Sequence, residues 1–336
     1  MLRLLKWFLG LSFAAALLLA VAALWWLNRP LPIAAQAASQ GVVDVSIPAG
    51  SSARRVAQLV VRSGFDTQPA LLFLWFRASG EGTRIKAGSY EFSPGTTPIS
   101  LLDKMVRGEQ AVRRVTLVEG WTYWQVLQAL QQAEHLQYDL PNAGPQALMQ
   151  HLGLAARHPE GRFFPDTYVY PKYATASSVL KQAAIAMEKR LAQAWAQRDP
   201  AVPLKSLEEV LIMASIIEKE TGKEADRTLV AGVFANRMRI GMRLQTDPTV
   251  IYGQGPEFSG RLRRVHLDTD NPYNTYTRAG LPPTPIAMPG MASIMAAVRP
   301  ANTDAFYFVA RGDGSSQFSR TLDEHNAAVR KYILGR

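Results

Sequence analysis

A single glutamate, Glu218, stands where a buried helix would present a carboxyl group to a ligand. The segment from Val210 to Ile217 is apolar almost throughout, and Glu218 follows it directly. A carboxyl group at the end of a buried helix is partly desolvated, and desolvation favours the protonated form that a general acid needs. Cleavage of a glycosidic bond requires such a proton donor. The alternative is a solvated helix end, because charged side chains are mostly exposed.

The helix that carries Glu218 is predicted over residues 206–222. Ser206 precedes an acidic first turn, which suits the helix dipole, and Gly222 follows the last apolar turn. Residues three and four positions away on a helix share a face with Glu218. These face-mates are all small: Ala214, Ser215, Thr221 and Gly222. We expect this face to leave room for a ligand.

An apolar segment near the N-terminus predicts the compartment. Residues 7–27 carry no charge, and about 21 residues at ~1.5 Å each span roughly the ~30 Å hydrocarbon core of a bilayer. Arg3 and Lys6 precede the segment, which places residues 1–6 in the cytoplasm. A cleaved signal peptide is the alternative, since residues 35–37 have a small-x-small form, but the apolar run exceeds the usual length. With either a membrane anchor or a signal peptide, most of the chain is expected outside the cytoplasm.

Length, charge and cysteine content narrow the function classes. The 336 residues suffice for a membrane segment and two folded units. A net charge of +10 favours an anionic partner, and export excludes nucleic acid, leaving anionic lipid or an acidic cell-wall polymer. The absence of cysteine excludes disulfides, thiolate metal sites and a cysteine nucleophile.

A small α+β module is predicted over residues 44–110, after a linker at 28–43. A strand near residues 45–47 leads through a turn into a helix capped by Ser51 or Ser52, with an apolar stripe at Val56, Leu59 and Val60. Residues 85–92 are predicted as a strand pair, and residues 99–106 as a helix that ends near Gly108.

The strand, glycine turn and capped helix occur twice. Gly50 and Val56 of the first copy match Gly120 and Val126, 70 positions later, where Thr122 is the cap. An internal repeat suggests duplicated small modules. The order of elements in the first copy resembles LysM modules, which bind glycans containing GlcNAc. A purely structural unit that packs on a catalytic domain is the alternative.

Several motifs occur in order over most of the C-terminal half. They are residues 160–168 (Glu-Gly-Arg-Phe-Phe-Pro-Asp-Thr-Tyr), 214–221 (Ala-Ser-Ile-Ile-Glu-Lys-Glu-Thr), 244–252, 271–276, 280–286, and Phe318, Ser319, Thr321, Glu324, His325 and Asn326. In these motifs and their spacing the chain resembles the YceG-like family of endolytic murein transglycosylases. Two positions depart from the family pattern. Met288 replaces an asparagine, which removes a polar contact, and no histidine stands shortly before Phe318.

The resemblance implies cleavage of the bond between MurNAc and GlcNAc in nascent glycan strands, leaving 1,6-anhydroMurNAc ends and terminating elongation. Glu218 stands at the family's catalytic glutamate. One carboxyl group protonates the leaving oxygen and then accepts the proton of the sugar's 6-hydroxyl, which attacks C1. No second carboxylate is obligatory, unlike in hydrolytic pairs. No cofactor is expected.

Polar and aromatic side chains from the same motifs are candidates for substrate binding. Asp247 could support an oxocarbenium-like transition state, or it could cap a turn before Pro248. No metal is expected, because Pro272 and Ala279 stand where a calcium loop starting at Asp268 would need ligands. The complete set of substrate-binding candidates is Ser215, Gln245, Thr246, Asp247, Thr249, Tyr252, Asn274 and Tyr276.

The sequence therefore predicts an α+β protein with a single transmembrane helix, a LysM-like α+β module and a larger α+β catalytic domain over residues 111–336. The catalytic domain is expected on the periplasmic side of the cytoplasmic membrane. Expected partners are peptidoglycan glycan strands and the membrane, with peptidoglycan synthases as candidates. Two alternatives stay open: a membrane-tethered, non-catalytic glycan-binding scaffold, and a muramidase that uses water with Asp247 as second carboxylate.

Overall fold

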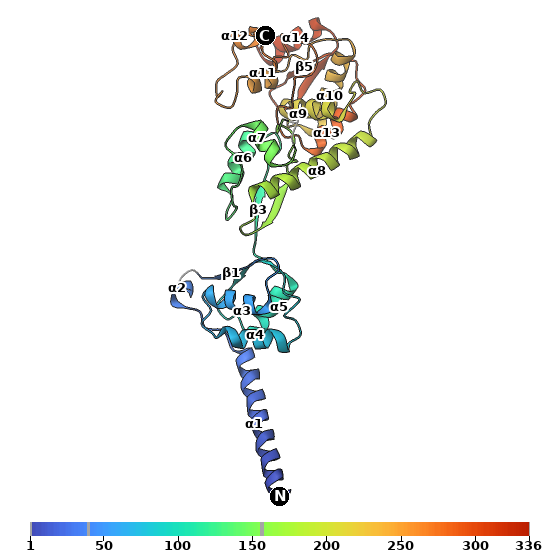
Figure 1. Ribbon diagram of the computed structural model, residues 1–336. Helices are drawn as coiled ribbons and strands as arrows, with labels where there is room; N and C mark the ends of the chain where they lie inside the picture. Colours follow the sequence, from blue (N-terminus) through green and yellow to red (C-terminus); the bar gives the residue numbers. More distant parts are fainter. Residues whose placement is uncertain (1, 39–40, 155–157, 336) are drawn as a thin grey trace. The chain divides into compact units, whose positions relative to one another are not determined.

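The computed structural model describes residues 2–38, 41–154 and 158–335 (Figure 1). Helices and three two-stranded sheets make up this part of the chain, which confirms the α+β class. The chain divides into two compact units, residues 1–113 with 170–173 (unit 1) and residues 114–169 with 174–336 (unit 2). The boundary predicted from the sequence lies between residues 110 and 111. That residues 170–173 also belong to unit 1 was not predicted.

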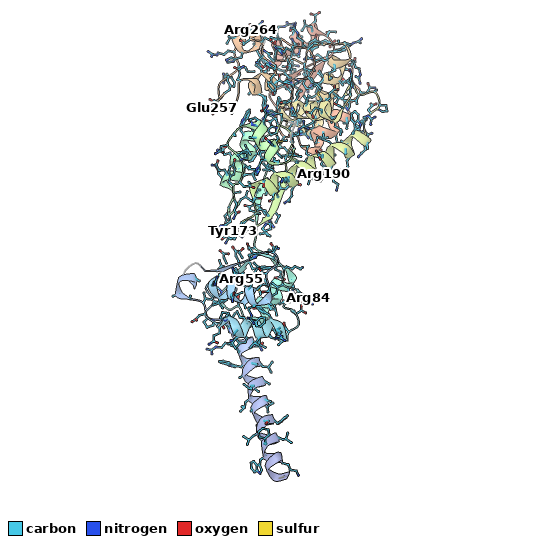
Figure 2. All side chains as sticks on the ribbon, in the orientation of Figure 1. Arg55, Arg84, Tyr173, Arg190, Glu257 and Arg264 are labelled. Carbon is cyan, nitrogen blue, oxygen red and sulfur yellow. The ribbon has the colours of Figure 1, made fainter. Side chains whose placement is uncertain are left out.

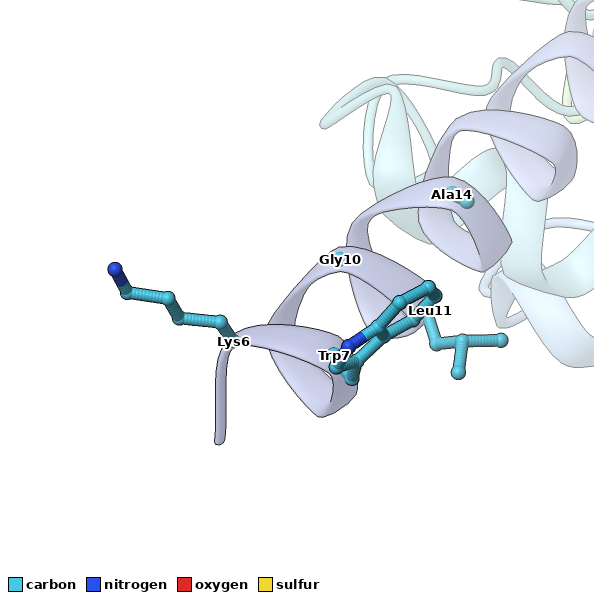
Figure 3. A pocket seen from close by; sticks show the side chains of 5 residues that line it. All are labelled: Lys6, Trp7, Gly10, Leu11 and Ala14. Carbon is cyan, nitrogen blue, oxygen red and sulfur yellow. The ribbon is translucent and has the colours of Figure 1, made fainter. Parts of the chain in front are cut away.

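The N-terminal helix α1 (Leu2–Asn28) contains the predicted membrane segment. Within the described residues, one helix is long and apolar enough to cross a membrane, over Lys6–Asn28. From Trp7 to Trp25 its apolar side chains are exposed and project from the helix (Figure 2). A shallow hollow of about 400 Å³ on α1 is lined by Lys6, Trp7, Gly10, Leu11 and Ala14 (Figure 3). It lies on the segment expected in the membrane, so it is no candidate for a catalytic cleft.

Unit 1 is built around a two-stranded antiparallel sheet. Its other elements are α2 (Ala35–Ala38), β1 (Val43–Ile47), α3 (Ala53–Arg62), α4 (Pro69–Ala78), β2 (Gly88–Phe92) and α5 (Pro98–Arg107). Val45 of β1 lies opposite Tyr90 of β2, and both are fully buried. The predicted strand pair within residues 85–92 is wrong, because β2 is one strand that pairs with the distant β1. Charged side chains such as Arg55 and Arg84 lie on the outside of unit 1 (Figure 2).

Ion pairs of the buried Lys172 with two partly exposed carboxylates tie residues 170–173 into unit 1. The ammonium group of Lys172 lies 2.7 Å from Asp44 and 2.9 Å from Glu91, and Arg113 contacts Glu91 at 2.7 Å. Burial alone would lower the pKa of Lys172, but the two carboxylates raise it. Lys172 is therefore a buried cation that is fully compensated.

The repeated sequence pattern corresponds to a repeated local structure. Gly50 and Gly120 both have φ near +75°, a backbone conformation that glycine adopts without strain. Each glycine is followed by a capped helix: the Ser52 hydroxyl accepts the Arg55 N–H, and Thr122 forms a capping box. The helix of the first copy is α3 and that of the second is α6, which belongs to unit 2.

Unit 2 consists mainly of helices. Two strands, β3 (Val112–Thr116) and β4 (Thr167–Pro171), pair with each other, and part of each lies in unit 2. The remaining elements are α6 (Tyr123–Gln132), α7 (Pro145–His151), α8 (Ala176–Ala196), α9 (Leu207–Glu220), α10 (Glu224–Arg239), α11 (Asp247–Gly253), α12 (Arg264–Asp268), α13 (Met291–Val298), β5 (Tyr307–Ala310), β6 (Ser316–Ser319) and α14 (Leu322–Tyr332).

Helix α9 is the centre of unit 2. Ser206 caps it by accepting the Glu209 N–H, and all eight residues from Val210 to Ile217 are buried. Because this helix is apolar on every side, it must be covered on every side. Helices α8, α10, α11 and α13 pack against it (Figure 1). The prediction of a buried helix over residues 206–222 is confirmed to within two residues at its end.

Candidate active site

Glu218 lies in the last turn of α9, where the helix leaves the core. Its side chain is half-buried, whereas the eight residues before it are buried. The backbone N–H of Gly290 donates to Oε2 of Glu218 at 2.9 Å. Because an N–H group can only donate, Oε2 cannot carry a proton toward it, and Oε1 is the oxygen that is protonated in the acid form.

Two chain segments meet beside Glu218. The Gly120 N–H donates to the Met288 carbonyl at 2.8 Å, and the Met288 N–H donates to the Trp121 carbonyl at 2.7 Å. These reciprocal bonds join the turn after β3 to the segment before α13. Lys219 donates to the Gly120 carbonyl at 3.2 Å, which attaches the turn to α9. Met288 is completely buried and acts through its backbone, so a polar side chain is not required for this contact.

The expected small-residue face is packed where it lies on α9, whereas Thr221 ends the helix and Gly222 lies beyond it and is exposed. Ala214 and Ser215 are completely buried. The Ser215 hydroxyl donates to the Ile212 carbonyl at 2.7 Å and accepts the Ile286 N–H at 3.0 Å. The expectation of ligand space on this side is therefore wrong, because the segment that ends at Gly290 occupies it. Small residues at these positions let that segment approach α9 closely.

A second part of the site surrounds Glu220, two residues beyond Glu218. The Thr246 hydroxyl donates to the Glu220 carboxyl group, and both side chains are largely removed from solvent. Burial raises the pKa of Glu220 to about 7; the Thr246 hydroxyl opposes this effect, Asp247 adds to it and Arg237 opposes it. Asp247 itself is exposed and accepts the Tyr276 hydroxyl at 2.6 Å.

Several of the predicted substrate-binding residues form the framework of this region. Thr249 is fully buried and donates to the Thr246 carbonyl at 2.8 Å. Asn274 is also fully buried; its amide donates to the carbonyls of Leu267 and Thr269 at 3.0 and 2.7 Å, and it accepts the Tyr276 N–H at 2.9 Å. Their side chains are engaged within the protein.

Four of the predicted residues have accessible side chains. Gln245 is exposed, with φ of +46°, and its N–H donates to the Thr275 carbonyl at 3.1 Å. Asp247 is exposed at the start of α11, and Tyr252 and Tyr276 are half-buried. The structure thus brings Gln245, Asp247 and Tyr276 together, with Tyr252 one helix length away on α11.

The sequence matches the profile of the YceG-like family over residues 45–331. The chain belongs to the YceG-like family. It is 31% identical over 314 residues to a Bacillus subtilis (strain 168) protein named endolytic murein transglycosylase, covering 88% of this chain and 86% of that protein. A protein of the same name from Streptococcus pneumoniae serotype 2 (strain D39 / NCTC 7466) is 28% identical over 345 residues, covering 91% of this chain and 61% of that protein.

A solved structure has a similar fold. The crystal structure of a YceG-like protein from Listeria monocytogenes is 29% identical and aligns with a TM-score of 0.53, covering 86% of this chain and 99% of that chain. The matched range, residues 45–331, spans the motifs on which the resemblance was based. The resemblance inferred from the motifs alone is therefore confirmed.

An aromatic cluster that was not predicted from the sequence lies beside a buried carboxyl group. The Trp124 ring lies 4.6 Å from that of Tyr123 and 5.4 Å from that of Tyr252, which in turn lies 4.9 Å from Tyr273. Glu160 is completely buried and accepts the Tyr123 N–H at 3.0 Å. Burial raises the pKa of Glu160 to about 8. Glu160 is the first residue of the motif at 160–168, and this is the sequence feature that could have drawn attention to it.

Proposed function

We propose that this protein is a membrane-anchored endolytic lytic transglycosylase that cleaves peptidoglycan glycan strands with Glu218 as acid and base. The proposal rests on one observation above all, the carboxyl group of Glu218 at the end of the buried helix α9, fixed by the Gly290 N–H at 2.9 Å. Membership of the YceG-like family and the name of the Bacillus subtilis relative support the reaction and the substrate class.

The reaction needs one carboxyl group in two roles. Oε1 of Glu218 gives its proton to the oxygen between MurNAc and GlcNAc, and the bond from that oxygen to C1 of MurNAc breaks. The resulting carboxylate takes the proton of the MurNAc 6-hydroxyl, whose oxygen bonds to C1. The products are a GlcNAc hydroxyl and a 1,6-anhydroMurNAc end, and Glu218 is protonated again. General acid and base catalysis of this kind contributes about 10²- to 10⁴-fold.

We assign the substrate-binding candidates to two groups according to their accessibility. Gln245, Asp247, Tyr252 and Tyr276 are proposed to contact sugar hydroxyls and ring faces, because their side chains are exposed or half-buried. The buried candidates are proposed to hold the framework of the site: Ser215, Thr246, Thr249 and Asn274.

The remaining assignments concern location and partners. Helix α1 is proposed as a single-pass anchor with Arg3 and Lys6 on the cytoplasmic side, which puts both units outside the cytoplasm. Nascent glycan strands are the proposed substrate there, with peptidoglycan synthases as partners and unit 1 as a LysM-like glycan-binding module. Protease added to intact spheroplasts should digest the exported units; complete protection would contradict this orientation.

Product analysis in ¹⁸O-labelled water tests the proposal. Purified glycan strands digested by the full chain should give anhydroMurNAc ends by mass spectrometry, lighter by one water molecule than reducing ends and free of ¹⁸O. Reducing ends that carry ¹⁸O would instead indicate a muramidase, with water as nucleophile. Strands that bind the protein but stay uncut would indicate a non-catalytic scaffold.

A further inference from the structure

The carboxyl group of Glu119 lies against Gly290, the residue whose N–H bonds Glu218. A Cβ atom placed on Gly290 would lie 1.8 Å from Oε1 of Glu119 and 2.2 Å from its carboxyl carbon. The Glu119 carboxyl group therefore occupies the space that a side chain at position 290 would fill. The same glycine donates its N–H to Glu218. One residue without a side chain thus lies against two acids.

The negative charge of Glu218 favours the protonated form of Glu119. Although much of the Glu119 side chain is exposed, burial of its carboxyl end and then the negative charge of Glu218 raise its pKa, while Arg227 on α10 lowers it. Lys219 on α9 contacts the same turn, because its ammonium group donates to the Gly120 carbonyl. Within the described ranges, neither glutamate forms an ion pair. Two adjacent carboxylates without a paired cation resist double ionisation.

We propose that Glu119 is a positioning residue that acts through Glu218, because the two carboxyl groups lie against the same glycine and the charge of one favours a proton on the other. This inference rests on the proposed role of Glu218. When Glu218 gives up its proton, the neighbouring negative charge makes its carboxylate a stronger base for the 6-hydroxyl proton. No further reactant is involved, since the proton returns to the pair at the end of the cycle.

Titration of the side-chain carboxyl groups tests the coupling without reference to activity. The full chain, labelled with ¹³C at glutamate side chains and held in detergent micelles, is followed by NMR as wild type, Glu119→Gln and Glu218→Gln. Replacing either glutamate should make the other titrate at a lower pH, because the neighbouring negative charge is removed. Glu257→Gln, at an exposed position, is the matched control and should shift neither. Absence of a mutual shift would overturn the inference.

The pH profile of cleavage tests the consequence. In Glu119→Gln the neighbouring negative charge is removed, so the alkaline limb of kcat/KM should move to lower pH, with activity retained on the acid side. Gly290→Ala should give the same shift, because its methyl group displaces the Glu119 carboxyl group while the backbone N–H to Glu218 stays. An equal loss at every pH in both variants would mean a structural role and overturn the inference.

The two tests separate this inference from the proposed function. If the mutual titration shift is present and the wild type cuts no strand, the proposed function fails and the coupled pair stands. If the wild type cuts strands, Glu218→Gln does not, and no mutual shift is found, the proposed function stands and the role of Glu119 falls.

Discussion

The hydroxyl oxygen of Ser215 accepts the backbone N–H of Ile286 at 3.0 Å, across 71 positions of sequence. This bond attaches the segment that precedes α13 to the fully buried face of α9. Four residues later, Gly290 donates its N–H to Glu218. The position of the Gly290 N–H relative to the candidate catalytic carboxyl group is therefore set in part by a serine that is itself completely buried.

Ser215→Ala should destabilise the protein and lower cleavage. Removal of the hydroxyl leaves the Ile286 N–H buried without an acceptor, which costs about 1–3 kcal/mol of unfolding free energy. Denaturant unfolding measures this cost. Ser259→Ala, at an exposed position of the same unit, should change stability by less than about 0.5 kcal/mol. Equal stability of the two variants would show that the Ser215 bond is not important.

Asn274→Ala should be among the more destabilising single changes in unit 2. The side chain is fully buried and bonds to backbone groups of the loop on both sides of it. Loss of these bonds should cost at least about 2 kcal/mol in denaturant unfolding. Gln245→Ala, in contrast, removes an exposed side chain and should weaken glycan binding without a loss of stability. A loss of stability in Gln245→Ala but not in Asn274→Ala would contradict the division into framework and contact residues.

Asp247→Asn tests whether a second carboxylate is obligatory at that position. Its carboxyl group accepts the Tyr276 hydroxyl at 2.6 Å, and an amide oxygen can accept the same bond. We expect kcat to fall by less than about tenfold, since a supporting charge is lost but no proton transfer is. A loss of about 10²-fold or more, together with reducing ends in the wild-type products, would favour the muramidase alternative.

Helix α9 and its glutamate follow from the sequence because they depend on local patterns. A capping serine, an acidic first turn and an uninterrupted apolar run define the helix, and Glu218 ends that run. The strand of unit 1 near Val45 and the helix that ends at Gly108 are predicted for the same reason. Both are found, with Gly108 in the left-handed conformation at the end of α5.

The contacts that build the site depend on residues far apart in sequence, which local patterns do not specify. The pairing of Gly120 with Met288, the Ser215 bond to Ile286 and the approach of Glu119 to Gly290 all join different segments. The same limit explains the wrong strand pair near residues 85–92, since alternation identifies a strand but not its partner. Small residues on one face of a helix leave space, but the sequence does not show whether a ligand or another segment of the chain fills it.

Stability should depend on pH through Glu160. Its pKa in the folded protein is raised by burial to about 8, above the ordinary value that it has when unfolded. The folded state therefore binds more protons between these values, and stability falls as pH rises through that window, by at most about 1.4 kcal/mol per pH unit from this group.

Glu160→Gln removes that dependence. The difference in unfolding free energy between the variant and the wild type should shift in favour of the variant as pH rises toward 8, whatever its value at low pH. Glu188→Gln, which replaces a glutamate on the helix α8, provides a comparison. If the difference in unfolding free energy stays constant from pH 5 to pH 8, Glu160 is ionised when folded.

The proposed reaction uses Glu218 as acid and base while the MurNAc 6-hydroxyl attacks C1 of the same sugar. Its most direct test is mass spectrometry of strands incubated with full-length wild type and with Glu218→Gln, after both are shown to unfold at the same denaturant concentration. The wild type should produce 1,6-anhydroMurNAc ends, and the variant should bind strands yet produce none above background. Anhydro ends formed by Glu218→Gln at the wild-type rate would contradict the claim.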